Sequence, residues 1–284
     1  MTIPTLLKIT GRNWVKESGV TLALGSWTLP IANILDTRPS IYAQASSNNP
    51  NTNTRFSVDL GVARKIDLIW FVYLRAGNTG TITIEIGNDA TFVTNLYTIT
   101  AETCWPQDNT VTDNWGNTTN GTFLALTYET INMPRFFPLS STVTARYIRV
   151  TVSDTGNATP LRIGCFGASE VASFQFTYNW QMSFMDDSIE TLAVSSTPYY
   201  EFRRRRRRLN ITFTPMDDAT LYGRFFDWLS WKGQTEPFVI LPFGEADYET
   251  RLEKVGLYGR RSAIPSFMNM IPGYNSLSLQ VDEL

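Results

Sequence analysis

Histidine is absent from this chain of 284 residues, and cysteine occurs only at Cys104 and Cys165. Without imidazole there is no Ser-His-Asp or Cys-His catalysis, no histidine zinc site and no usual general base near neutral pH. Two distant cysteines are also too few for a thiolate metal site. The sequence leaves a disulfide between them open, but in a large cytoplasmic chain two such cysteines are more often free and packed than bridged.

Long apolar runs are missing as well. No run approaches the roughly 20 residues that span a bilayer, and residues 1–18 lack the charged start and apolar centre of a secretory signal. The formal net charge is −2, without the broad basic field of a nucleic-acid-binding protein. We therefore expect a protein that is made in a cytoplasm, with no membrane span and no nucleic-acid specificity.

Most acidic residues are scattered singly, and Asp186-Asp187 and Asp217-Asp218 are adjacent pairs. The second pair precedes a predicted helix and is explained as its N-terminal cap. Asp89 stands in a Gly-Asn-Asp turn, where we expect it to form the turn rather than to bind a metal. Two carboxylates facing a cleft would still allow glycoside cleavage, but the sequence shows no such pair and no nucleotide fingerprint. It predicts no enzyme, no cofactor and no metal site.

Short strands separated by turns fill residues 1–172. Residues 56–60, 81–86 and 146–152 alternate apolar and polar side chains, and we expect Gly61 to end the first of these strands. Residues 65–74 are apolar on both faces, which places them in the middle of a sandwich. Regular strands with long Asn-, Thr- and Gly-rich loops predict a β-sandwich or jelly roll.

Residues 20–170 resemble a discoidin-like (galactose-binding-like) domain. Members of that family show a D…P…W/Y opening, a VDLG strand, an SND turn and a late RYIR strand. The matching positions here are Asp36, Pro39, Tyr42, residues 58–61, residues 88–89 and residues 146–149. The chain departs from the family by Gly-Asn-Asp in the turn and by a long insert over residues 104–121. The resemblance implies an eight-stranded jelly roll with a candidate sugar-binding loop end.

Aromatic residues near loops are the candidates for carbohydrate binding, because the flat faces of sugars stack on aromatic rings. Trp105 and Trp115 lie in the insert, and Tyr42 and Arg75 lie beside predicted strand ends. For each of them, packing or loop anchoring is the alternative role.

Residues 173–284 predict a second unit of α+β type, with one helix packed on a curved sheet. Residues 173–184 carry large apolar side chains at every even position, a face that must be covered. A helix is expected over residues 215–233, with Leu221, Phe225, Trp228 and Leu229 along one side and Gly233 as its stop. Further strands are expected over residues 238–243, 251–258 and 276–281.

Six consecutive arginines enter a strand in this second unit. By strand alternation, Arg203, Arg205 and Arg207 continue the apolar face of Leu209, Ile211 and Phe213, whereas Arg204, Arg206 and Arg208 point to the other face. Buried arginines need partners, and an acidic surface on a second copy is the simplest supplier. We therefore predict that all six arginines lie in a subunit interface. The acids considered as partners are Asp186, Asp187, Glu190, Glu245, Asp247 and Glu249. A nucleic-acid patch, a targeting signal and a solvated edge strand are the alternatives.

Residues 173–284 also resemble the belt domain of phage distal and minor tail proteins. An arginine-rich strand, a helix, a G…F strand and a final G-Y…S-L-x-L…E strand carry this resemblance. It implies a structural virion protein of the tail tip, a ring (expected to be a hexamer) around the tail tube. Its partners would be tail-tube and tail-tip hub proteins and a host surface glycan. The alternative is a stand-alone carbohydrate-binding or host-adhesion module.

Overall fold

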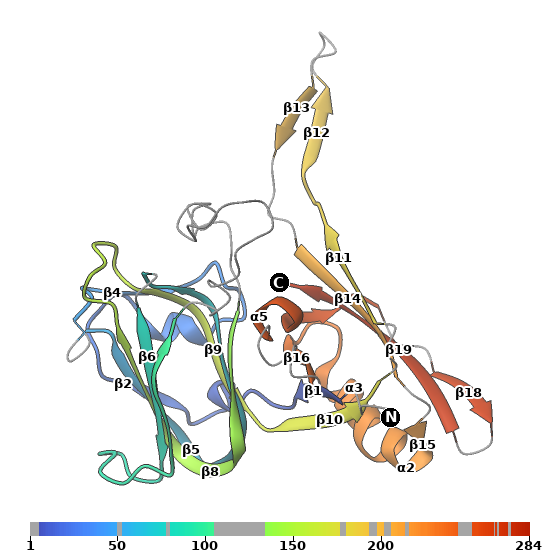
Figure 1. The fold of residues 1–284 in the computed structure, drawn as a ribbon, viewed down its shortest axis with the longest axis horizontal. Coiled ribbons are helices and arrows are strands. Elements are labelled where there is room, and N and C mark those ends of the chain that lie inside the picture. The colour runs from blue at the N-terminus through green and yellow to red at the C-terminus, as the bar shows by residue number, and fades with distance from the viewer. Residues whose placement is uncertain are drawn as a thin grey trace, which may run out of the picture. The chain divides into compact units, whose positions relative to one another are not determined.

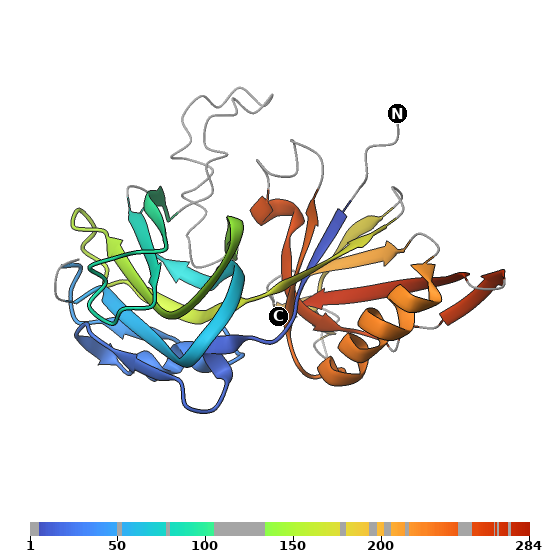
Figure 2. The same cartoon turned by 90° about the horizontal axis from the view of Figure 1, so that it is seen from below.

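The computed structural model describes residues 6–49, 53–77, 80–104, 134–176, 180–192, 198–201, 206–213, 216–243, 252–263, 265, 267–271 and 274–284. The fold is mainly β, with antiparallel sheets (Figures 1 and 2). The chain forms two compact units, here called the N-terminal unit (Lys8–Ala172 with Glu245–Gly256) and the C-terminal unit (Met1–Leu7, Ser173–Gly244 and Leu257–Leu284). The sequence predicted two continuous domains, 1–172 and 173–284. In the structure Met1–Leu7 belongs to the C-terminal unit and Glu245–Gly256 to the N-terminal unit.

The N-terminal unit is an eight-stranded antiparallel sandwich. Its strands are β2 (Thr21–Ala23), β3 (Trp27–Leu29), β4 (Ala43–Ala45), β5 (Arg55–Arg75), β6 (Thr81–Gly87), β7 (Tyr97–Thr103), β8 (Arg135–Ser153) and β9 (Arg162–Ser169). Its short helices are η1 (Trp14–Lys16), η2 (Ile31–Leu35) and α5 (Leu252–Val255). The strand order is β3-β4-β9-β5-β8-β6-β7, with β2 on β5. The long strands β5 and β8 pair along both their halves and so take part in both layers.

A bend in β5 joins the two layers. Gly61 has a φ of +77°, and the register shifts between Asp59 and Arg64. Asp59 accepts hydrogen bonds from the Gly61 N–H at 2.8 Å and from Arg146 Nε at 2.7 Å. The Arg146 guanidinium lowers the pKa of Asp59. The expectation that Gly61 ends a strand is therefore wrong, because the strand bends there and continues.

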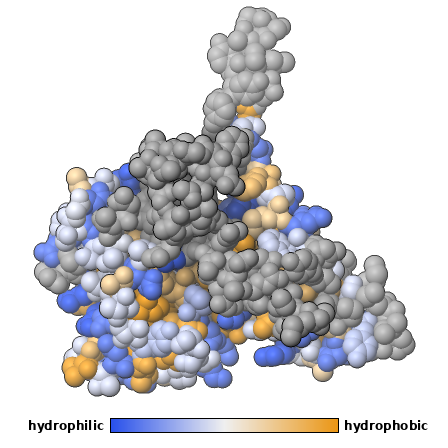
Figure 3. All heavy atoms as spheres, in the orientation of Figure 1, coloured by the Kyte–Doolittle hydropathy of each residue, from blue (hydrophilic) through white to orange (hydrophobic). Residues whose placement is uncertain are grey.

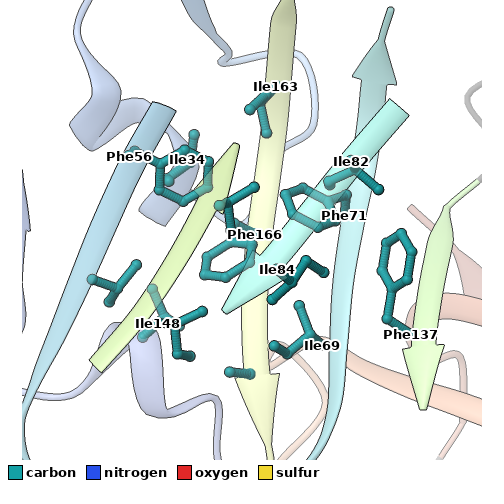
Figure 4. Packing of buried hydrophobic residues seen from close by; sticks show 14 of the residues in the cluster. Ile34, Phe56, Ile69, Phe71, Ile82, Ile84, Phe137, Ile148, Ile163 and Phe166 are labelled. Carbon is teal, nitrogen blue, oxygen red and sulfur yellow. The ribbon is translucent and has the colours of Figure 1, made fainter. Parts of the chain in front are cut away.

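The core lies between the two layers (Figure 4). Its side chains come from alternate positions, such as Ile82 and Ile84 on β6 and Ile148 on β8, all of them buried. The Phe166 ring packs against Phe71, with the centroids 5.0 Å apart. Burying one such side chain stabilises the fold by about 1.5–3 kcal/mol. As predicted, residues 65–74 are central: this part of β5 pairs with β8 on one side and with β9 on the other.

The C-terminal unit is built on a nine-stranded sheet and a helix. Its strands are β1 (Leu6–Thr10), β10 (Val171–Gln175), β11 (Gln181–Met185), β12 (Ile189–Leu192), β13 (Pro198–Glu201), β14 (Arg206–Thr212), β15 (Met216–Asp217), β16 (Phe238–Phe243), β17 (Leu257–Arg261), β18 (Phe267–Ile271) and β19 (Tyr274–Glu283). The order of the nine-stranded sheet is β10-β1-β16-β17-β19-β14-β11, with β15 and β18 on β19, and β12 and β13 pair as a separate two-stranded sheet. An isolated bridge pairs Phe176, which follows β10, with Phe213, which follows β14.

Two predictions for this unit need correction. Residues 252–255 form helix α5 and the strand follows as β17, so the strand expected over residues 251–258 is displaced. The alternation over residues 173–184 predicts one strand, whereas β10 ends at Gln175 and β11 begins at Gln181. Phe174 and Phe176 are buried, as expected of a covered face, but Phe184 is 71% exposed within this chain. Tyr178 lies outside the described residues.

The predicted helix is confirmed. It consists of α2 (Asp218–Thr220), a π-helical segment η4 (Leu221–Phe225) and α3 (Phe226–Lys232). Asp217 caps it by accepting from the Thr220 N–H at 2.7 Å, and Gly233, with a φ of +57°, ends it. The four side chains expected to face the sheet are buried: Leu221, Phe225, Trp228 and Leu229. No helix in the described part of the chain is long and apolar enough to cross a membrane.

Candidate functional site

Three neighbouring strands of the N-terminal unit carry a row of polar side chains on the outer face of the sandwich. Arg162 on β9 is the register partner of Gln44 on β4 and of Arg75 on β5. Residues directly opposite each other share a face of a sheet. The next residues along these strands, Ala43, Ile163 and Leu74, are buried in the core. The row Gln44–Arg162–Arg75 therefore points away from the core.

An aromatic row runs beside this polar row. The rings of Tyr42 and Tyr73 lie 5.7 Å apart between centroids, at an angle of 46°. Gly164 follows Ile163 on the strand between them. A Cβ on Gly164 would lie 2.5 Å from the Pro39 carbonyl oxygen and 3.0 Å from Tyr73 Cβ. Glycine therefore leaves room for the Pro39 carbonyl and for Tyr73 beside it.

Tyr73 has a left-handed backbone, with a φ of +59°. This conformation costs a residue with a side chain about 1–3 kcal/mol. It also changes the alternation of β5, since Phe71 and Leu74, three positions apart, both belong to the core. Tyr73 is the extra residue that this shift leaves on the outer face, so the strain places its ring beside Tyr42. We refer to the two rows together as the tyrosine–arginine face.

Arg162 is held by neutral groups. Its Nε donates to Gln44 Oε1 at 2.9 Å, and its guanidinium lies 5.0 Å from the centre of the Tyr42 ring, a cation–π contact. Within the described residues it forms no ion pair with an acid. Its register partner Arg75 carries a second positive charge. All five side chains of the face are half-buried, so each keeps some surface open to solvent.

A polar hollow of about 600 Å³ lies where β4 and β9 meet the loops. Its lining consists of Ser46, Ser47, Asn48, Asn49, Thr155, Asn157, Ala158 and Pro160. Asn48 fixes the walls: its Nδ2 donates to the Asn157 carbonyl at 2.6 Å, and its Oδ1 accepts from the Leu161 N–H at 2.9 Å. The hollow adjoins the polar row, because Ser46 follows Gln44 by two residues and Pro160 precedes Arg162 by two.

Asp154 ties the end of β5 to this loop. It is 2% exposed, and its Oδ2 accepts from the Gly77 N–H at 2.8 Å and from Asn157 Nδ2 at 3.0 Å. Its Oδ1 is buried without a hydrogen-bond partner, and a Cβ on Gly77 would lie 2.7 Å from it. The carboxylate therefore holds the chain just after Arg75 against the wall of the hollow.

The structure brings together two of the four residues proposed for carbohydrate binding. Tyr42 and Arg75 lie on one face, joined through Arg162, whereas Trp105 and Trp115 lie outside the described residues. Sequence reasoning missed Gln44, Tyr73 and Arg162. Strand alternation would have placed Arg162 and the apolar Ile163 on opposite faces of the sheet. No local signal, however, shows which strands pair with the strand of Arg162.

The three described arginines of the run, Arg206, Arg207 and Arg208, pair with acids of the same chain. Arg206 Nε donates to Asp187 at 2.8 Å, Arg207 binds Glu283 through its side chain at 2.7 Å, and Arg208 Nε donates to Asp282 at 2.7 Å. Arg207 shares the buried face with Leu209 and Ile211 and is 7% exposed, as strand alternation predicts. Arg203, Arg204 and Arg205 lie outside the described residues.

The argument that these arginines need a second copy is therefore wrong for Arg206, Arg207 and Arg208. Asp187 was among the acids considered, but Asp282 and Glu283 were not. These two reach the arginines because β19 pairs with β14, with Asp282 opposite Arg208. The Asp282 carboxylate raises the pKa of Arg208. The assignment of the run to a subunit interface stays a prediction, now without its electrostatic reason.

Cys104 and Cys165 are both buried and are not joined in a disulfide, which is the state that the sequence favours. Burial raises the pKa of Cys104 to about 12, so its thiol is protonated and inert at neutral pH. Among the described residues, no group of three or more histidine, cysteine or acidic side chains is placed to hold a metal ion.

The sequence matches no protein-family model and no curated protein. Solved structures give weak similarities. The family 32 carbohydrate-binding module of Clostridium perfringens NanJ, solved with galactose, has a TM-score of 0.38 and 18% identity, over 57% of this chain and 99% of that one. CBM32-1 from a family 31 glycoside hydrolase of C. perfringens has a TM-score of 0.36 and 12% identity, over 54% and 95%. A Ruminococcus gnavus GH29 fucosidase, solved with fucose, has a TM-score of 0.39 and 17% identity, over 57% and 27%.

Proposed function

We propose that the N-terminal unit binds a carbohydrate on the tyrosine–arginine face and the adjoining polar hollow, and that the chain acts as a binding protein without catalysis. The observation that carries this proposal is the contact of Tyr42 and Tyr73 over Gly164, directly beside a row of hydrogen-bonding side chains. Rings give a platform for the apolar face of a pyranose, and fixed polar groups orient its hydroxyls.

The hollow supports the same conclusion. Its lining is made of hydroxyls, amides and two small apolar residues, which suits a ligand rich in hydroxyl groups. Asn48 and Asp154 fix its walls from inside the unit. Binding therefore requires little ordering of the protein, and this lowers the entropic cost of holding a ligand.

Calorimetric titration against a panel of oligosaccharides tests the proposal. Tyr42→Ala should weaken binding of any sugar that binds by about tenfold or more, because a stacked ring contributes about 0.5–1.5 kcal/mol beyond the area that it buries. Tyr274→Ala in the C-terminal unit removes a tyrosine that is 46% exposed and lies outside both proposed surfaces, so it should leave affinity unchanged. If Tyr42→Ala binds sugars like the unchanged protein, the face is not the binding site.

A second proposal concerns the C-terminal unit: copies of the chain assemble through it, as a ring at the tip of a phage tail in the virion. The support is exposed aromatic surface. Phe184 on the end strand β11 is 71% exposed, and on the helix Tyr222 (57% exposed) contacts Phe226 (46% exposed), with centroids 6.2 Å apart. Polar and apolar residues are otherwise intermixed on the face drawn in Figure 3. Contiguous exposed apolar surface favours a contact between proteins, and Tyr222 and Phe226 form such a pair on the helix.

Size-exclusion chromatography with light scattering tests assembly. We expect an oligomer that Phe184→Ser or Tyr222→Ser converts to smaller species, with thermal unfolding of the subunit little changed. Leu96→Ser in the N-terminal unit, at a residue 51% exposed, is the matched control and should leave the oligomer intact. If the unchanged protein stays monomeric at high concentration, the assembly proposal is contradicted, whereas the proposed sugar binding is not affected.

A further inference from the structure

We infer that the tyrosine–arginine face takes an acetylated sugar, whose acetyl carbonyl is bound by Arg162 and Gln44 and whose acetyl methyl group packs on Leu29. The inference rests on the proposed carbohydrate binding and deepens it, by naming the class of ligand. Gln44 on β4 has two register partners, Arg162 on β9 and Leu29 on β3. Residues directly opposite each other share a face of a sheet, so a polar and an apolar side chain flank Gln44 on the outer face.

Gln44 and Arg162 together present hydrogen-bond donors to a ligand. Arginine has five N–H donors and no acceptor. Because Arg162 Nε can only donate, the Gln44 atom that it meets at 2.9 Å is the carbonyl oxygen Oε1. This leaves the donor Nε2 of Gln44 and the terminal nitrogens of Arg162, none of which makes a hydrogen bond in the described part of the chain. The two side chains therefore suit a ligand group that accepts hydrogen bonds.

Leu29 adds an apolar surface beside these donors. Strand alternation alone would place Trp27 and Leu29 on the same face, but the register shifts between them. Trp27 packs against the core, whereas Leu29 lies on the outer face opposite Gln44 and is 37% exposed. A ligand that covers Leu29 therefore gains the free energy of burying apolar surface.

An acetyl group matches both features of this row. Its carbonyl oxygen accepts hydrogen bonds from the Arg162 guanidinium and from Gln44 Nε2, and the bond from the charged group is about twice as strong as a neutral one. Its methyl group, next to the carbonyl, covers Leu29, because neighbouring strands are only about 4.7–4.9 Å apart. A hydroxyl group leaves Leu29 uncovered, and an ammonium group carries a charge of the same sign as Arg162.

Tyr42 connects this row to the proposed sugar platform. The Arg162 guanidinium lies 5.0 Å from the centre of the Tyr42 ring and also binds Gln44, so the ring and the row are neighbours. A pyranose that rests on the tyrosines thus presents a substituent at its edge to Arg162 and Gln44. Because two contacts already fix the guanidinium, binding the acetyl group orders little of the protein.

Calorimetric titration with matched ligands tests the inference. The first probes are chitotetraose, which carries N-acetyl groups, cellotetraose, which has the same backbone with hydroxyl groups, and the fully deacetylated glucosamine tetramer. N-acetylgalactosamine with galactose, and O-acetylated xylotetraose with xylotetraose, extend the comparison to other sugars and to acetyl esters. We expect at least one acetylated probe to bind tenfold or more tightly than its parent, and the glucosamine tetramer to bind more weakly than chitotetraose.

The outcomes separate the two proposals. A preference for the N-acetyl probes alone, or for the O-acetyl probe alone, would support the inference and identify the linkage. If no acetylated probe binds more tightly than its parent, or if the glucosamine tetramer binds tightest, the acetyl class is overturned while carbohydrate binding stands. No binding of any probe would count against both proposals.

Variants assign the effect to Leu29 and Gln44. Leu29→Ser should weaken binding of the acetylated probe about fourfold, as expected for one buried methyl group, and leave the parent nearly unchanged. Val93→Ser, at a residue of the same unit that is 84% exposed, is the matched control and should change neither. Gln44→Glu replaces the donor Nε2 by an acceptor of the same shape and should lower the affinity for the acetylated probe tenfold or more. An equal loss for acetylated and parent probes in both variants, with unchanged thermal unfolding, would show that the row does not read the acetyl group.

Discussion

Both units of this protein carry arginines on neighbouring strands, but the residues opposite them differ. In the C-terminal unit Arg208 lies opposite Asp282, and Arg207 is bound by Glu283 one residue further along the same strand. In the N-terminal unit Arg162 lies opposite Arg75 on one side and Gln44 on the other. Six consecutive arginines are conspicuous in the sequence, whereas Arg162 stands alone. The number of arginines in a segment is thus a poor guide to binding, and the register partner of each is a better one.

The strongest test of this comparison is the buried pair of the C-terminal unit. Glu283→Gln should lower the free energy of unfolding by about 3–5 kcal/mol, because it leaves the buried Arg207 charge without a carboxylate. Urea unfolding measures this. Arg206→Ala is the control: its pair with Asp187 is partly exposed, with 34% and 39% of the two side chains accessible, so the change should cost at most about 1 kcal/mol.

The double variant Arg207→Met with Glu283→Leu sharpens the same test. Removing both partners takes away the desolvation cost along with the attraction, so it should be much less destabilising than Glu283→Gln alone. A double variant as unstable as the single one would mean that the pair is needed for packing rather than for charge. It also follows that reversing Arg207 to Glu would disturb the fold, and an assembly test should avoid that residue.

The platform of the N-terminal unit gives the next largest effect. Gly164→Ala should lower the free energy of unfolding by about 1–3 kcal/mol through overpacking, since its Cβ would lie 2.5 Å from a backbone oxygen that has little room to move. Sugar binding should weaken as the tyrosines separate. Gly156→Ala, where nothing lies within 4 Å of the new Cβ, should change neither. Unchanged stability in Gly164→Ala would refute the close packing of this face.

Features set by local sequence were predicted well. Asp217 and Gly233 marked the ends of the helix because caps act within one turn, and alternation alone placed Arg207 on the buried face. The sandwich followed from the strand patterns of the N-terminal half. Tyr42 and Arg75 were found one by one, from their places near strand ends.

What escaped prediction depends on pairing between distant segments. Gln44 and Arg162 are 118 residues apart, and Arg208 and Asp282 are 74 apart, yet each pair is joined by hydrogen bonds. The strand pattern of one segment says which face a residue occupies, not which strand comes beside it. Tyr73 adds a second reason: its left-handed φ shifts the alternation of β5, and no residue type in that segment signals the shift.

An ion pair inside the N-terminal unit provides the mildest test, and it isolates what is special about Arg162. Arg149 on β8 lies opposite Glu85 on β6 and donates to it at 2.6 Å, so an arginine of this sandwich does meet a carboxylate when its register supplies one.

The hydrogen bond from Arg149 lowers the pKa of Glu85, and a hydrogen bond from Asn95 adds to this effect. Because the folded pKa lies below the unfolded one, the stability from this pair is full above the usual glutamate pKa of about 4.3 and is lost as the pH falls through the folded value. Glu85→Gln should therefore lower the free energy of unfolding by about 1 kcal/mol at pH 7. In acid the variant and the unchanged protein should differ less in their free energy of unfolding. Urea unfolding at pH 7 and below the folded pKa of Glu85 measures this. If the difference were the same at both pH values, the pair would act through packing, and the contrast between Arg149, which lies opposite a carboxylate, and Arg162, which lies opposite Gln44 and Arg75, would lose its electrostatic basis.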